Sequence, residues 1–580
     1  MDENKFYLKK IRIKNFRNFE DIEVNTTRKN IVIGMNDVGK TNLLYALKMV
    51  FDYKVRNIDL LESDFHKKRK DIPFEIIISV NIGKNDSFYS DLILSEIKNL
   101  RKSQLGNENI LNIKLIGDFF EGISMFWNVS IDCNNIERNS WEKIPAININ
   151  KNKIDLIFKV FDIPPYNEVK QKFKEFKRNI LQSEKEKEKE KETVDLILGE
   201  QLSIRNKINE LKTVKKIQDE ITSTLEKFDV SYGVKVLSTL GLKSIYDDLE
   251  IFNIQNEDEE IYPTSGDGRR KTILYALFLY EIMQEVGKIP IILLEEPENH
   301  LFINSQISLS RTILEGNEFS NIFLSTHSPE LLYCLTKETN IIRIVREENK
   351  TVSRSSIFTL PKEFDKLKNI VQKDLVRALF CKEVLLVEGY SEKILFDYIL
   401  DEKVKNIEDR TSKFILNIIG VNFEIYYNFL KDLGIKILLK TDNDLRKKGS
   451  NKVELYGINR ICKLLKLPTE IDLEEVIVAR NEETKEDKAK RFSLMREVYS
   501  AKKELIEKFE EVNCYLSEVD FENDLATVLE KDQSFVKKLQ ESKWYNLYEE
   551  HFFVEIFNDT NIEKILASKY FKCIKELING

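Results

Sequence analysis

The sequence has few cysteines and histidines, and neither residue type has the spacing of a zinc site or a disulfide framework. Its six cysteines are scattered over 580 residues with no Cys-x-x-Cys pair. This pattern argues against zinc-binding modules and against a fold stapled by disulfides. Because there are only four histidines, the position of each one matters.

Long apolar runs are also missing. No stretch approaches the ~18–20 consecutive apolar residues that a membrane-spanning helix needs. The opening residues, MDENKFYLKK, lack the apolar segment of a signal peptide. We therefore expect a cytoplasmic protein with no membrane partner. A length of 580 residues exceeds what one hydrophobic core supports, so two or more domains are expected.

The chain has no strong excess of one charge, since 91 basic residues stand against 98 acidic ones. A basic face can be hidden in such an average, so composition does not identify a partner. Gly and Pro are nearly missing from about 169 to 228, where residues 184–192 read EKEKEKEKE. Alternating charge is typical of a solvated helix or a flexible linker.

Apolar residues that flank this charged segment have a spacing compatible with a helical seam. We therefore expect a helical hairpin that can pack against a copy of itself. The seam residues are Ile204, Ile208, Leu211, Ile217, Ile221, Leu225 and Phe228.

A phosphate-binding motif lies near the start of the chain. GMNDVGKT, residues 34–41, fits G-x-x-x-x-G-K-[ST] and stands between a predicted strand and a predicted helix. Backbone N–H groups of such a loop surround phosphates. Lys40 is expected to reach the β- and γ-phosphates of a nucleotide, and Thr41 to hold Mg²⁺. The residues expected to bind nucleotide here are Gly34, Asn36, Asp37, Gly39, Lys40, Thr41 and Asn42.

Two later strand ends complete the predicted nucleotide site. In IILLEEPE, Glu295 has the position that helps to hold Mg²⁺, and Glu296 the position of a base for the attacking water. Two acids after four apolar residues are costly unless they bind something. His327, in LSTHSPE, follows another predicted strand and is placed to hydrogen-bond a γ-phosphate.

These stretches resemble the ABC-type ATPases of the SMC and recombination-mediator kind, in which a long insert divides the head into two lobes. The resemblance implies a signature loop before the acidic pair, and YPTSGDGRRK, residues 262–271, is the candidate. Its residues are Ser265, Gly266 and Gly268. Because the loop departs from the LSGGQ/E pattern, hydrolysis of ATP and simple sensing of ATP both stay open.

A second set of acids follows predicted strands nearer the C-terminus. Glu388 closes EVLLVEGYSEK, and Glu392 lies one turn into the helix that follows. Asp442 and Asp444 end the apolar run IKILLKTDNDL. Neighbouring parallel strands end at one crevice, where crowded carboxylates repel unless cations compensate them. Mg²⁺ or Mn²⁺, in a two-metal site, is the expected occupant.

A strand-end Glu followed by a strand-end Asp-x-Asp resembles the Toprim fold of topoisomerases, primases and a class of nucleases. No module with a tyrosine nucleophile follows, and no zinc-binding region is present, so the first two classes are disfavoured. An ABC head followed by Toprim resembles the OLD-family nucleases. The order of GMNDVGKTN, YPTSGDGRRK, FLSTHSPELLY, EGYSEKILF, KTDNDL and LSEVDFENDL is similar to that of the nuclease subunits of Gabija anti-phage defence systems.

The resemblance adds a third acidic cluster and a basic residue. The cluster is Glu518, Asp520, Glu522 and Asp524, and the basic residue is Lys543. Because the acids alternate, we expect the first three on one face of an extended segment. The expected catalytic residues are Glu388, Asp520 and Lys543. The expected metal ligands are Glu388, Glu392, Asp442, Asp444, Asp520 and Glu522.

We expect an α/β protein in which an ABC-type ATPase head, split by a helical dimerisation insert, is followed by a C-terminal Toprim domain. The expected segments are an ATPase N-lobe at 1–165, the insert at 166–235, an ATPase C-lobe at 236–360, a linker helix at 361–380 and the Toprim nuclease domain at 381–580.

The expected function is that of a metal-dependent DNA endonuclease, which nicks DNA and is regulated by ATP or another NTP. The resemblance further implies double-stranded DNA as substrate, a UvrD-like helicase as partner subunit, and a homo-oligomer, either dimer or tetramer. Two alternatives stay open. One is a DNA-binding, repair-type ATPase whose Toprim domain only binds DNA. The other is a scaffold that oligomerises through the insert and recruits a helicase.

Overall fold

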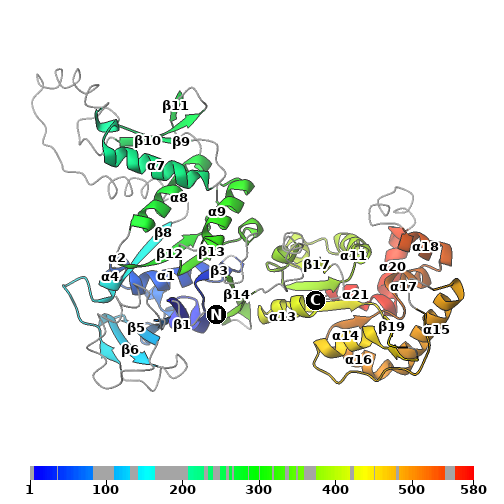
Figure 1. Ribbon diagram of the computed structural model, residues 1–580. Coiled ribbons are helices and arrows are strands. Elements are labelled where there is room, and N and C mark those ends of the chain that lie inside the picture. Colours follow the sequence, from blue (N-terminus) through cyan, green and yellow to red (C-terminus); the bar gives the residue numbers. More distant parts are fainter. Residues whose placement is uncertain are drawn as a thin grey trace, which may run out of the picture. The chain divides into compact units, whose positions relative to one another are not determined.

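The chain forms two compact units, Met1–Phe358 and Thr359–Gly580. They are drawn in the computed structural model of Figure 1. The structure describes residues 6–35, 37–82, 110–130, 141–163, 207–227, 233–238, 249–255, 260–263, 267–284, 287–299, 301–316, 319–332, 339–347, 350–357, 374–418, 423–449, 451–478, 483–541 and 556–579. Within these ranges, no helix combines the length and the apolar character that crossing a membrane requires.

The first unit contains an antiparallel six-stranded sheet with the order β2-β1-β4-β5-β6-β7. Its strands are β1 (Tyr7–Phe16), β2 (Phe19–Asn25), β4 (Phe74–Asn81), β5 (Ile110–Asp118), β6 (Gly122–Ser130) and β7 (Glu142–Lys143). The alternation of buried and exposed residues along β2 is that of a sheet with one solvated face.

A second six-stranded sheet, with the order β15-β14-β3-β13-β12-β8, carries the predicted nucleotide site. Its strands are β3 (Lys29–Ile33), β8 (Phe158–Ile163), β12 (Ile289–Glu295), β13 (Ile322–Ser325), β14 (Thr339–Glu347) and β15 (Lys350–Ile357). Five strands are parallel, and β15 closes the edge as an antiparallel hairpin with β14. The parallel strands β3, β12 and β13 therefore end at one edge.

The helix α1 (Lys40–Phe51) contributes to a core cluster shared with strands of both sheets, and it contacts β8, β12 and β13. Short helices complete this part of the unit. They are α2 (Tyr53–Arg56), η1 (Glu62–Asp64), η2 (His66–Lys68), α4 (Ile154–Ile157), α9 (Ile303–Glu315) and η6 (Pro329–Leu332).

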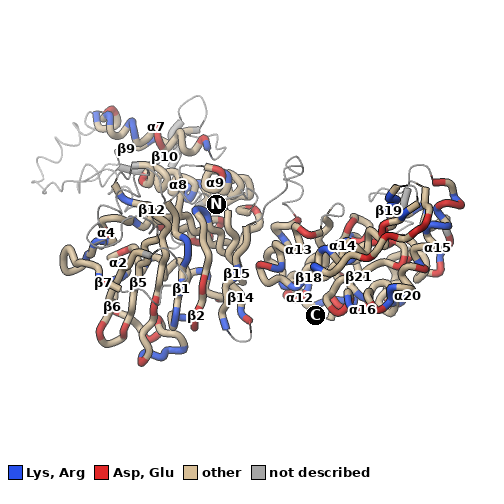
Figure 2. The backbone as a smooth tube through the Cα atoms, turned by 60° about the horizontal axis from the view of Figure 1, so that its bottom comes forward, with Lys and Arg blue, Asp and Glu red and all other residues tan. Residues whose placement is uncertain are grey.

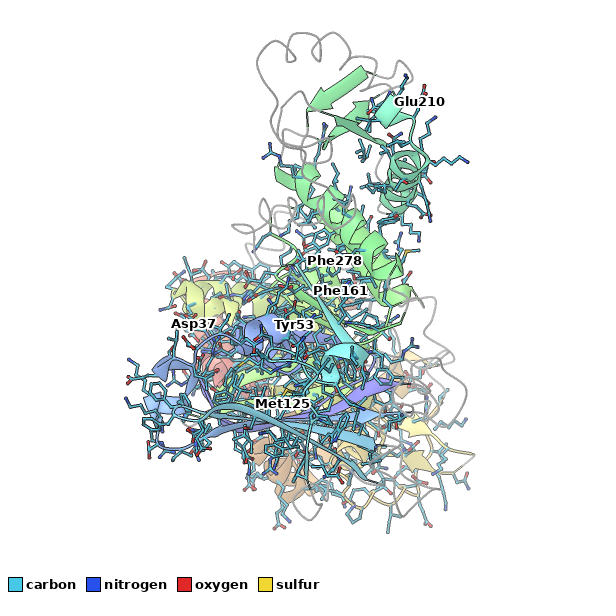
Figure 3. The ribbon with its side chains drawn as sticks, turned by 90° about the vertical axis from the view of Figure 1, so that its left-hand side faces the viewer. Asp37, Tyr53, Met125, Phe161, Glu210 and Phe278 are labelled. Carbon is cyan, nitrogen blue, oxygen red and sulfur yellow. The ribbon has the colours of Figure 1, made fainter. Side chains whose placement is uncertain are left out.

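An arm of the first unit projects from the sheets (Figure 1). It consists of α7 (Lys212–Glu226), part of α8 (Asp267–Gln284) and the three-stranded sheet β9 (Gly233–Ser238), β10 (Leu249–Gln255) and β11 (Glu260–Pro263). Figure 3 shows the other part of α8 reaching the sheets, where Phe278 meets Phe161 of β8 with ring centroids 6.2 Å apart.

We expected the seam residues to pack against a second copy of the chain. This prediction is wrong for those that are already buried within the chain. They pack in one cluster with residues of α8 and β9 of the same chain, because this amphipathic face is covered from within the arm. The buried seam residues are Ile208, Ile217, Ile221 and Leu225. Leu211 is exposed, and Ile204 and Phe228 lie outside the described residues.

The second unit is built on a parallel four-stranded sheet with the order β17-β16-β18-β21. Its strands are β16 (Glu383–Val387), β17 (Lys413–Asn417), β18 (Lys436–Thr441) and β21 (Cys514–Leu516), and a separate hairpin joins β19 (Arg446–Lys447) and β20 (Val453–Glu454). The expected linker helix, 361–380, is described only from residue 374.

Helices surround this parallel sheet. One core cluster joins the sheet with α11, α17, α18, α20 and α21, while α13, α14 and α16 contact β18 or β21. The helices are α11 (Tyr390–Lys403), α12 (Ile407–Thr411), α13 (Phe423–Asp432), α14 (Tyr456–Leu464), α15 (Lys485–Ala501), α16 (Lys503–Glu511), α17 (Phe521–Val528), α18 (Gln533–Glu541), α20 (Asp559–Ala567), η9 (Lys569–Phe571) and α21 (Lys572–Asn579).

Candidate functional site

The phosphate-binding motif forms the loop between β3 and α1. Gly39 precedes the helix with φ 114°, in the left-handed region. A Cβ at this position would lie 2.3 Å from the side-chain nitrogen of Asn18, so only glycine fits. Asn42 donates to Asn18 Oδ1 at 2.7 Å and fixes the first turn of α1 to the β1–β2 turn. Asp37 stands in the loop with φ 61° (Figure 3).

Lys40 turns back on its own loop. Its Nζ donates to the backbone oxygens of Gly34 at 3.1 Å and Met35 at 2.8 Å. Burial lowers the pKa of Lys40, and Glu296 and Glu298 oppose that shift. A phosphate in the loop would offer this ammonium charged acceptors, which form stronger hydrogen bonds than neutral carbonyls do.

The strand ends bring the other predicted nucleotide-site residues to this loop. The Thr41 hydroxyl donates to the Glu295 carboxylate. Glu296 follows β12 with φ 42°, and its Oε1 lies 3.3 Å from His327 Nε2. Burial and the nearby Lys40 lower the pKa of His327. The neutral imidazole is therefore favoured near neutral pH.

Two residues that sequence reasoning missed hold the acidic loop. Glu298 Oε1 accepts from the Thr326 hydroxyl at 2.8 Å and from the His327 N–H at 2.7 Å. Lys271 of α8 is fully buried and donates to the Asn299 carbonyl at 2.7 Å. Burial lowers the pKa of Lys271 to about 8. Glu298 is visible in the sequence as a third acid in EEPE, whereas Lys271 gives no signal beyond its place as the last residue of the signature-loop stretch.

The signature loop is described only in part. Gly268 lies in the first turn of α8, where its carbonyl accepts from the Thr272 hydroxyl at 3.0 Å. Three of the residues expected at the nucleotide site, Asn36, Ser265 and Gly266, lie outside the described residues.

In the second unit, the first acidic pair stands where β16 meets α11. Glu388 directly follows the strand, and Gly389 is the N-cap of the helix. Glu392 Oε2 accepts from the Gly389 N–H at 2.8 Å, the backward contact of a capping box. This contact places the buried Glu392 carboxylate beside the end of the strand.

The Asp-x-Asp turn follows the neighbouring strand, β18. Glu388 Oε1 accepts from the Asp442 N–H at 3.0 Å and from the Thr441 hydroxyl. Asp442 Oδ1 in turn accepts from the Phe521 N–H at 3.0 Å and the Ser517 hydroxyl at 3.1 Å. Three strand ends, those of β16, β18 and β21, are thus joined through carboxylates.

The third acidic cluster begins a helix, so the expected extended segment with its acids on one face is wrong. Asp520 is the N-cap of α17 and accepts from the Asn523 N–H at 2.8 Å. Glu522 lies in the first turn of that helix. Capping by an Asp side chain satisfies a free N–H group of the first turn and favours a helix start over a strand.

The remaining two acids of this cluster bind lysines. Glu518 Oε2 lies 3.3 Å from Lys569 Nζ. Asp524 and Lys440 are both buried, and their charged atoms are 3.6 Å apart. The expected catalytic residue Lys543 lies outside the described residues.

The acids at the strand ends act electrostatically on one another. Burial, and then the charges of Glu388 and Glu522, raise the pKa of Glu392 to about 8. The pKa of Asp442 is raised well above its usual value by burial and then by Glu388, Glu392 and Asp520. Burial and then Asp520 raise the pKa of Glu522 to about 7.

These carboxylates supply the oxygen ligands that Mg²⁺ and Mn²⁺ prefer, and their crowding is relieved by positive charge, so they fit divalent cations. Within the described ranges, however, no three acidic, histidine or cysteine side chains have the spacing of a preformed metal centre. The acids converge without yet forming a chelate.

Arg460 of α14, which sequence reasoning missed, supplies positive charge to this cluster. Its Nη1 donates to the Glu388 carboxylate, and its Nη2 donates to Asp444 Oδ2 at 3.1 Å. Only 9% of the Arg460 side chain is exposed. With this arginine between them, Glu388 and Asp444 already have a cationic partner, which removes part of their repulsion.

A glycine allows α14 to reach the acids. A Cβ on Gly457 would lie 2.3 Å from the Asp442 carbonyl oxygen and 2.8 Å from the Asp444 nitrogen. The Gly457 N–H also donates to the Asp444 carbonyl at 2.9 Å. The helix therefore packs backbone to backbone against the Asp-x-Asp turn.

Gly457→Ala should lower the thermal unfolding midpoint by roughly 5 °C, because overpacking against backbone atoms costs about 1–3 kcal/mol. Differential scanning fluorimetry measures this shift. Gly233→Ala is the control, because its added Cβ meets nothing nearer than 3.6 Å and should leave the midpoint unchanged. Equal midpoints for wild type and Gly457→Ala would contradict the close contact.

In EDTA, the stability of the chain should fall as pH rises from about 5 to about 8. The folded-state pKa of Glu392 is about 8, above the 4.5 of an unperturbed glutamate, so the folded state holds a proton that the unfolded chain releases. The midpoint should decrease by about 5 °C over this range. Glu392→Gln, which stays neutral, should flatten the dependence, even though the charges of Glu388 and Glu522 still act on this position. An equal slope in both proteins would contradict this assignment.

Two family matches define the class of this chain. Residues 7–332 match the family described as AAA ATPase domain. Residues 379–444 match the TOPRIM domain of overcoming lysogenization defect protein-like proteins. The predicted order of an ATPase head and a C-terminal Toprim α/β domain is thereby confirmed.

The chain belongs to the family of GajA endonucleases. It is 34% identical to Endonuclease GajA of Bacillus cereus (strain VD045), over 98% of this chain and 99% of that protein. It is 23% identical to Old nuclease of Escherichia phage P2, over 75% of this chain and 77% of the relative. Identity to DNA replication and repair protein RecF of Streptococcus gordonii is 22%, over 58% of this chain and 98% of the relative. The predicted resemblance to OLD-family and Gabija nucleases is confirmed.

Proposed function

We propose that this chain is a metal-dependent DNA endonuclease whose cutting is regulated by nucleotide at its ATPase head. The observation that carries the proposal is the cluster of Glu392, Asp442 and Glu522. These acids come from three segments far apart in the sequence, and burial together with the neighbouring carboxylates raises the pKa of each. Membership of an endonuclease family supports the reaction class.

Five carboxylates would hold Mg²⁺ or Mn²⁺ in this proposal. They are Glu388, Glu392, Asp442, Asp520 and Glu522. A pair of such ions, when bound, activates water and neutralises the leaving oxygen in phosphodiester hydrolysis. Asp444 would join them if Arg460 released it. Lys543 is proposed to offset negative charge that develops in the transition state.

The chain's own hydrogen bonds prepare Glu388 for this role. The Thr441 hydroxyl and the Asp442 N–H fix one of its carboxylate oxygens. Arg460 neutralises part of the local negative charge, which would otherwise repel a DNA phosphate.

Nucleotide binding is proposed at the loop of the head. The Thr41–Glu295 and Glu296–His327 contacts support it, since they gather at one strand edge the residue types that bind Mg²⁺ and the γ-phosphate. The signature loop departs from its usual pattern, so we propose ATP or another NTP as a regulator, with weak hydrolysis at most.

The resemblance to Gabija nuclease subunits supports three further parts of the proposal. The substrate is double-stranded DNA, which is nicked on one strand. The partner is a UvrD-like helicase subunit that acts with this chain in anti-phage defence. The chain is a homo-oligomer, a dimer or a tetramer, formed by surfaces other than the covered seam of α7.

Supercoiled plasmid with the purified chain tests the nuclease proposal. In Mg²⁺ or Mn²⁺, relaxed circles should form before linear molecules, and EDTA should prevent both. Linear products that appear first would contradict nicking. A plasmid that stays supercoiled under all conditions would contradict the nuclease itself.

A repair-type ATPase that only binds DNA is the second candidate, and the likeness to RecF favours it. It predicts rapid ATP hydrolysis stimulated by DNA, with no strand scission. Measuring phosphate release and plasmid topology in the same reaction separates the two candidates.

A further inference from the structure

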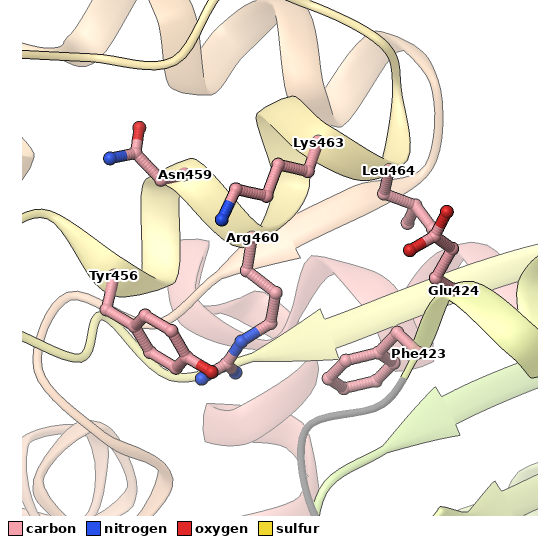
Figure 4. A pocket seen from close by; sticks show the side chains of 7 residues that line it. All are labelled: Phe423, Glu424, Tyr456, Asn459, Arg460, Lys463 and Leu464. Atoms are coloured by element: carbon pink, nitrogen blue, oxygen red, sulfur yellow. The ribbon is translucent and has the colours of Figure 1, made fainter. Parts of the chain in front are cut away.

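A small pocket lies beside Arg460, between α13 and α14 (Figure 4). Its volume is about 150 Å³, enough for several waters at about 30 Å³ each, or for one phosphate group. Phe423, Glu424, Tyr456, Arg460 and Lys463 are among the residues that line it. The pocket adjoins the acidic cluster, because Arg460 also contacts Glu388 and Asp444.

The pocket contains hydrogen-bond donors whose acceptors are not in the described part of the chain. Arg460 uses both of its Nη atoms on other residues, but its buried Nε has no hydrogen-bond partner there. Lys463 is exposed, and no acid of the described ranges lies within ion-pair distance of it. A buried arginine donor without an acceptor is costly unless a ligand supplies one.

Aromatic rings hold the arginine in place. The guanidinium carbon of Arg460 lies 4.9 Å from the ring centroid of Tyr456 and 6.0 Å from that of Phe423. Figure 4 shows the guanidinium between these two rings, with Lys463 extending from the same helix. The rings make the donor rigid and dry, which strengthens a hydrogen bond to an anion.

The charge of the lining favours an anion. Arg460 and Lys463 are cations, whereas among the described residues that line the pocket Glu424 is the one acid, and it is exposed. Figure 2 shows Lys and Arg interspersed with Asp and Glu over both units, so overall charge does not direct DNA to this edge.

We propose that this pocket binds a phosphodiester group of the DNA strand, next to the phosphodiester that the acidic cluster would cleave. The proposal rests on the proposed nuclease function. Nε of Arg460 and the ammonium of Lys463 would donate to the phosphate oxygens, while both Nη atoms of Arg460 stay on Glu388 and Asp444. Phosphate contacts carry no base information and fix the register of a strand. The pocket would thus set which bond faces the acids.

Binding of a fluorescein-labelled duplex oligonucleotide to the full chain in EDTA tests this without any cleavage. Lys463→Ala should weaken binding about 5-fold for every base sequence, and it should reduce the slope of log affinity against log salt by about 0.9, the value for one lost phosphate contact on B-DNA. Lys463→Arg should restore both quantities. Lys466→Ala removes an exposed lysine just beyond the C-cap of the same helix that is not among the residues lining the pocket, and it should change neither.

An unchanged slope in Lys463→Ala, or an equal loss in Lys466→Ala, would overturn the proposal. Inorganic phosphate and AMP serve as competitors that identify the source of the phosphate. If either binds wild type but not Lys463→Ala, while oligonucleotide binding is the same in both proteins, the pocket belongs to a free phosphate ligand and not to the strand.

The failure of this proposal can be told apart from the failure of the nuclease proposal. Strand binding that depends on Lys463, in a chain that never cuts plasmid, would remove the nuclease and leave the pocket. Plasmid cleavage with a normal salt slope in Lys463→Ala would remove only the pocket.

Discussion

Glu388→Gln should reduce plasmid cleavage by about 10²–10³-fold while the chain stays folded. The substitution keeps the volume of the side chain and removes the negative charge that a divalent cation needs. Glu388 also accepts three hydrogen bonds, from Thr441, Asp442 and Arg460. The end of β18 and the helix α14 therefore hold its carboxylate in one orientation. Initial rates of relaxed-circle formation in Mg²⁺ and in Mn²⁺ measure the effect.

Asp520→Asn should give a similar loss, because the third segment contributes to the same cluster. Glu408→Gln is the matched control, since Glu408 is an exposed acid on α12. Its cleavage rate should equal that of wild type. Thermal midpoints of all variants show whether a loss reflects unfolding. Undiminished cleavage by both Glu388→Gln and Asp520→Asn would eliminate the acidic cluster as the cutting site.

Millimolar ATP should suppress plasmid cleavage about 10-fold, within the range that coupled sites commonly show. Lys40→Ala should cleave at nearly the same rate with and without ATP. The Lys40 ammonium donates to the carbonyls of Gly34 and Met35 in its own loop. Without that ammonium, the loop loses its charged contact to the β- and γ-phosphates. Titration of ATP against initial cleavage rates, with free Mg²⁺ held constant, measures the coupling.

Glu296→Gln separates binding from hydrolysis. It should retain nucleotide and keep the suppression, because the loop and Lys40 are intact, while any ATP turnover falls. A non-hydrolysable ATP analogue should suppress wild type to the same extent. Equal cleavage with and without ATP in wild type would show that the nuclease is not regulated by its head.

The sequence was sufficient to predict the strand ends that carry the acids. Apolar runs that end in Glu295, Glu388 and Asp442 indicate buried parallel strands, and the geometry of such sheets brings their ends to one edge. The phosphate loop was equally readable, since a fixed spacing of glycines and Lys40 is tied to one backbone shape. Both predictions succeed because each local sequence pattern is compatible with one backbone structure, a buried strand in one case and a phosphate-binding loop in the other.

The arginine that contacts the acidic cluster, Arg460, is not predictable from a local pattern of this kind. Arg460 is one basic residue in an amphipathic helix, and its importance arises only from the backbone contact that Gly457 permits. The predicted conformation of the segment around Asp520 is wrong for another reason. The alternation of acids indicates a strand, but Asp520 is also a residue type that favours the N-cap of a helix, and the Asn523 side chain donates to it.

The seam of α7 shows a third limit. Its spacing correctly indicated an amphipathic helix with one buried face. Periodicity does not say what covers such a face. Here Ile273 and Leu277 of α8 cover it, and they lie some 50 residues or more beyond it in the sequence.

The contact of Lys271 with the acidic loop has a mechanical consequence. A helix of 18 residues is about 27 Å long. Near its start, α8 is anchored by a dry amine to the Asn299 carbonyl, and Ile273, Ala276 and Leu277 carry the packed face of α7. A shift of the Glu296 loop that preserves the Lys271 hydrogen bond must therefore move α8 and α7 together. The arm would then move with the loop that carries Glu296, Glu298 and Asn299.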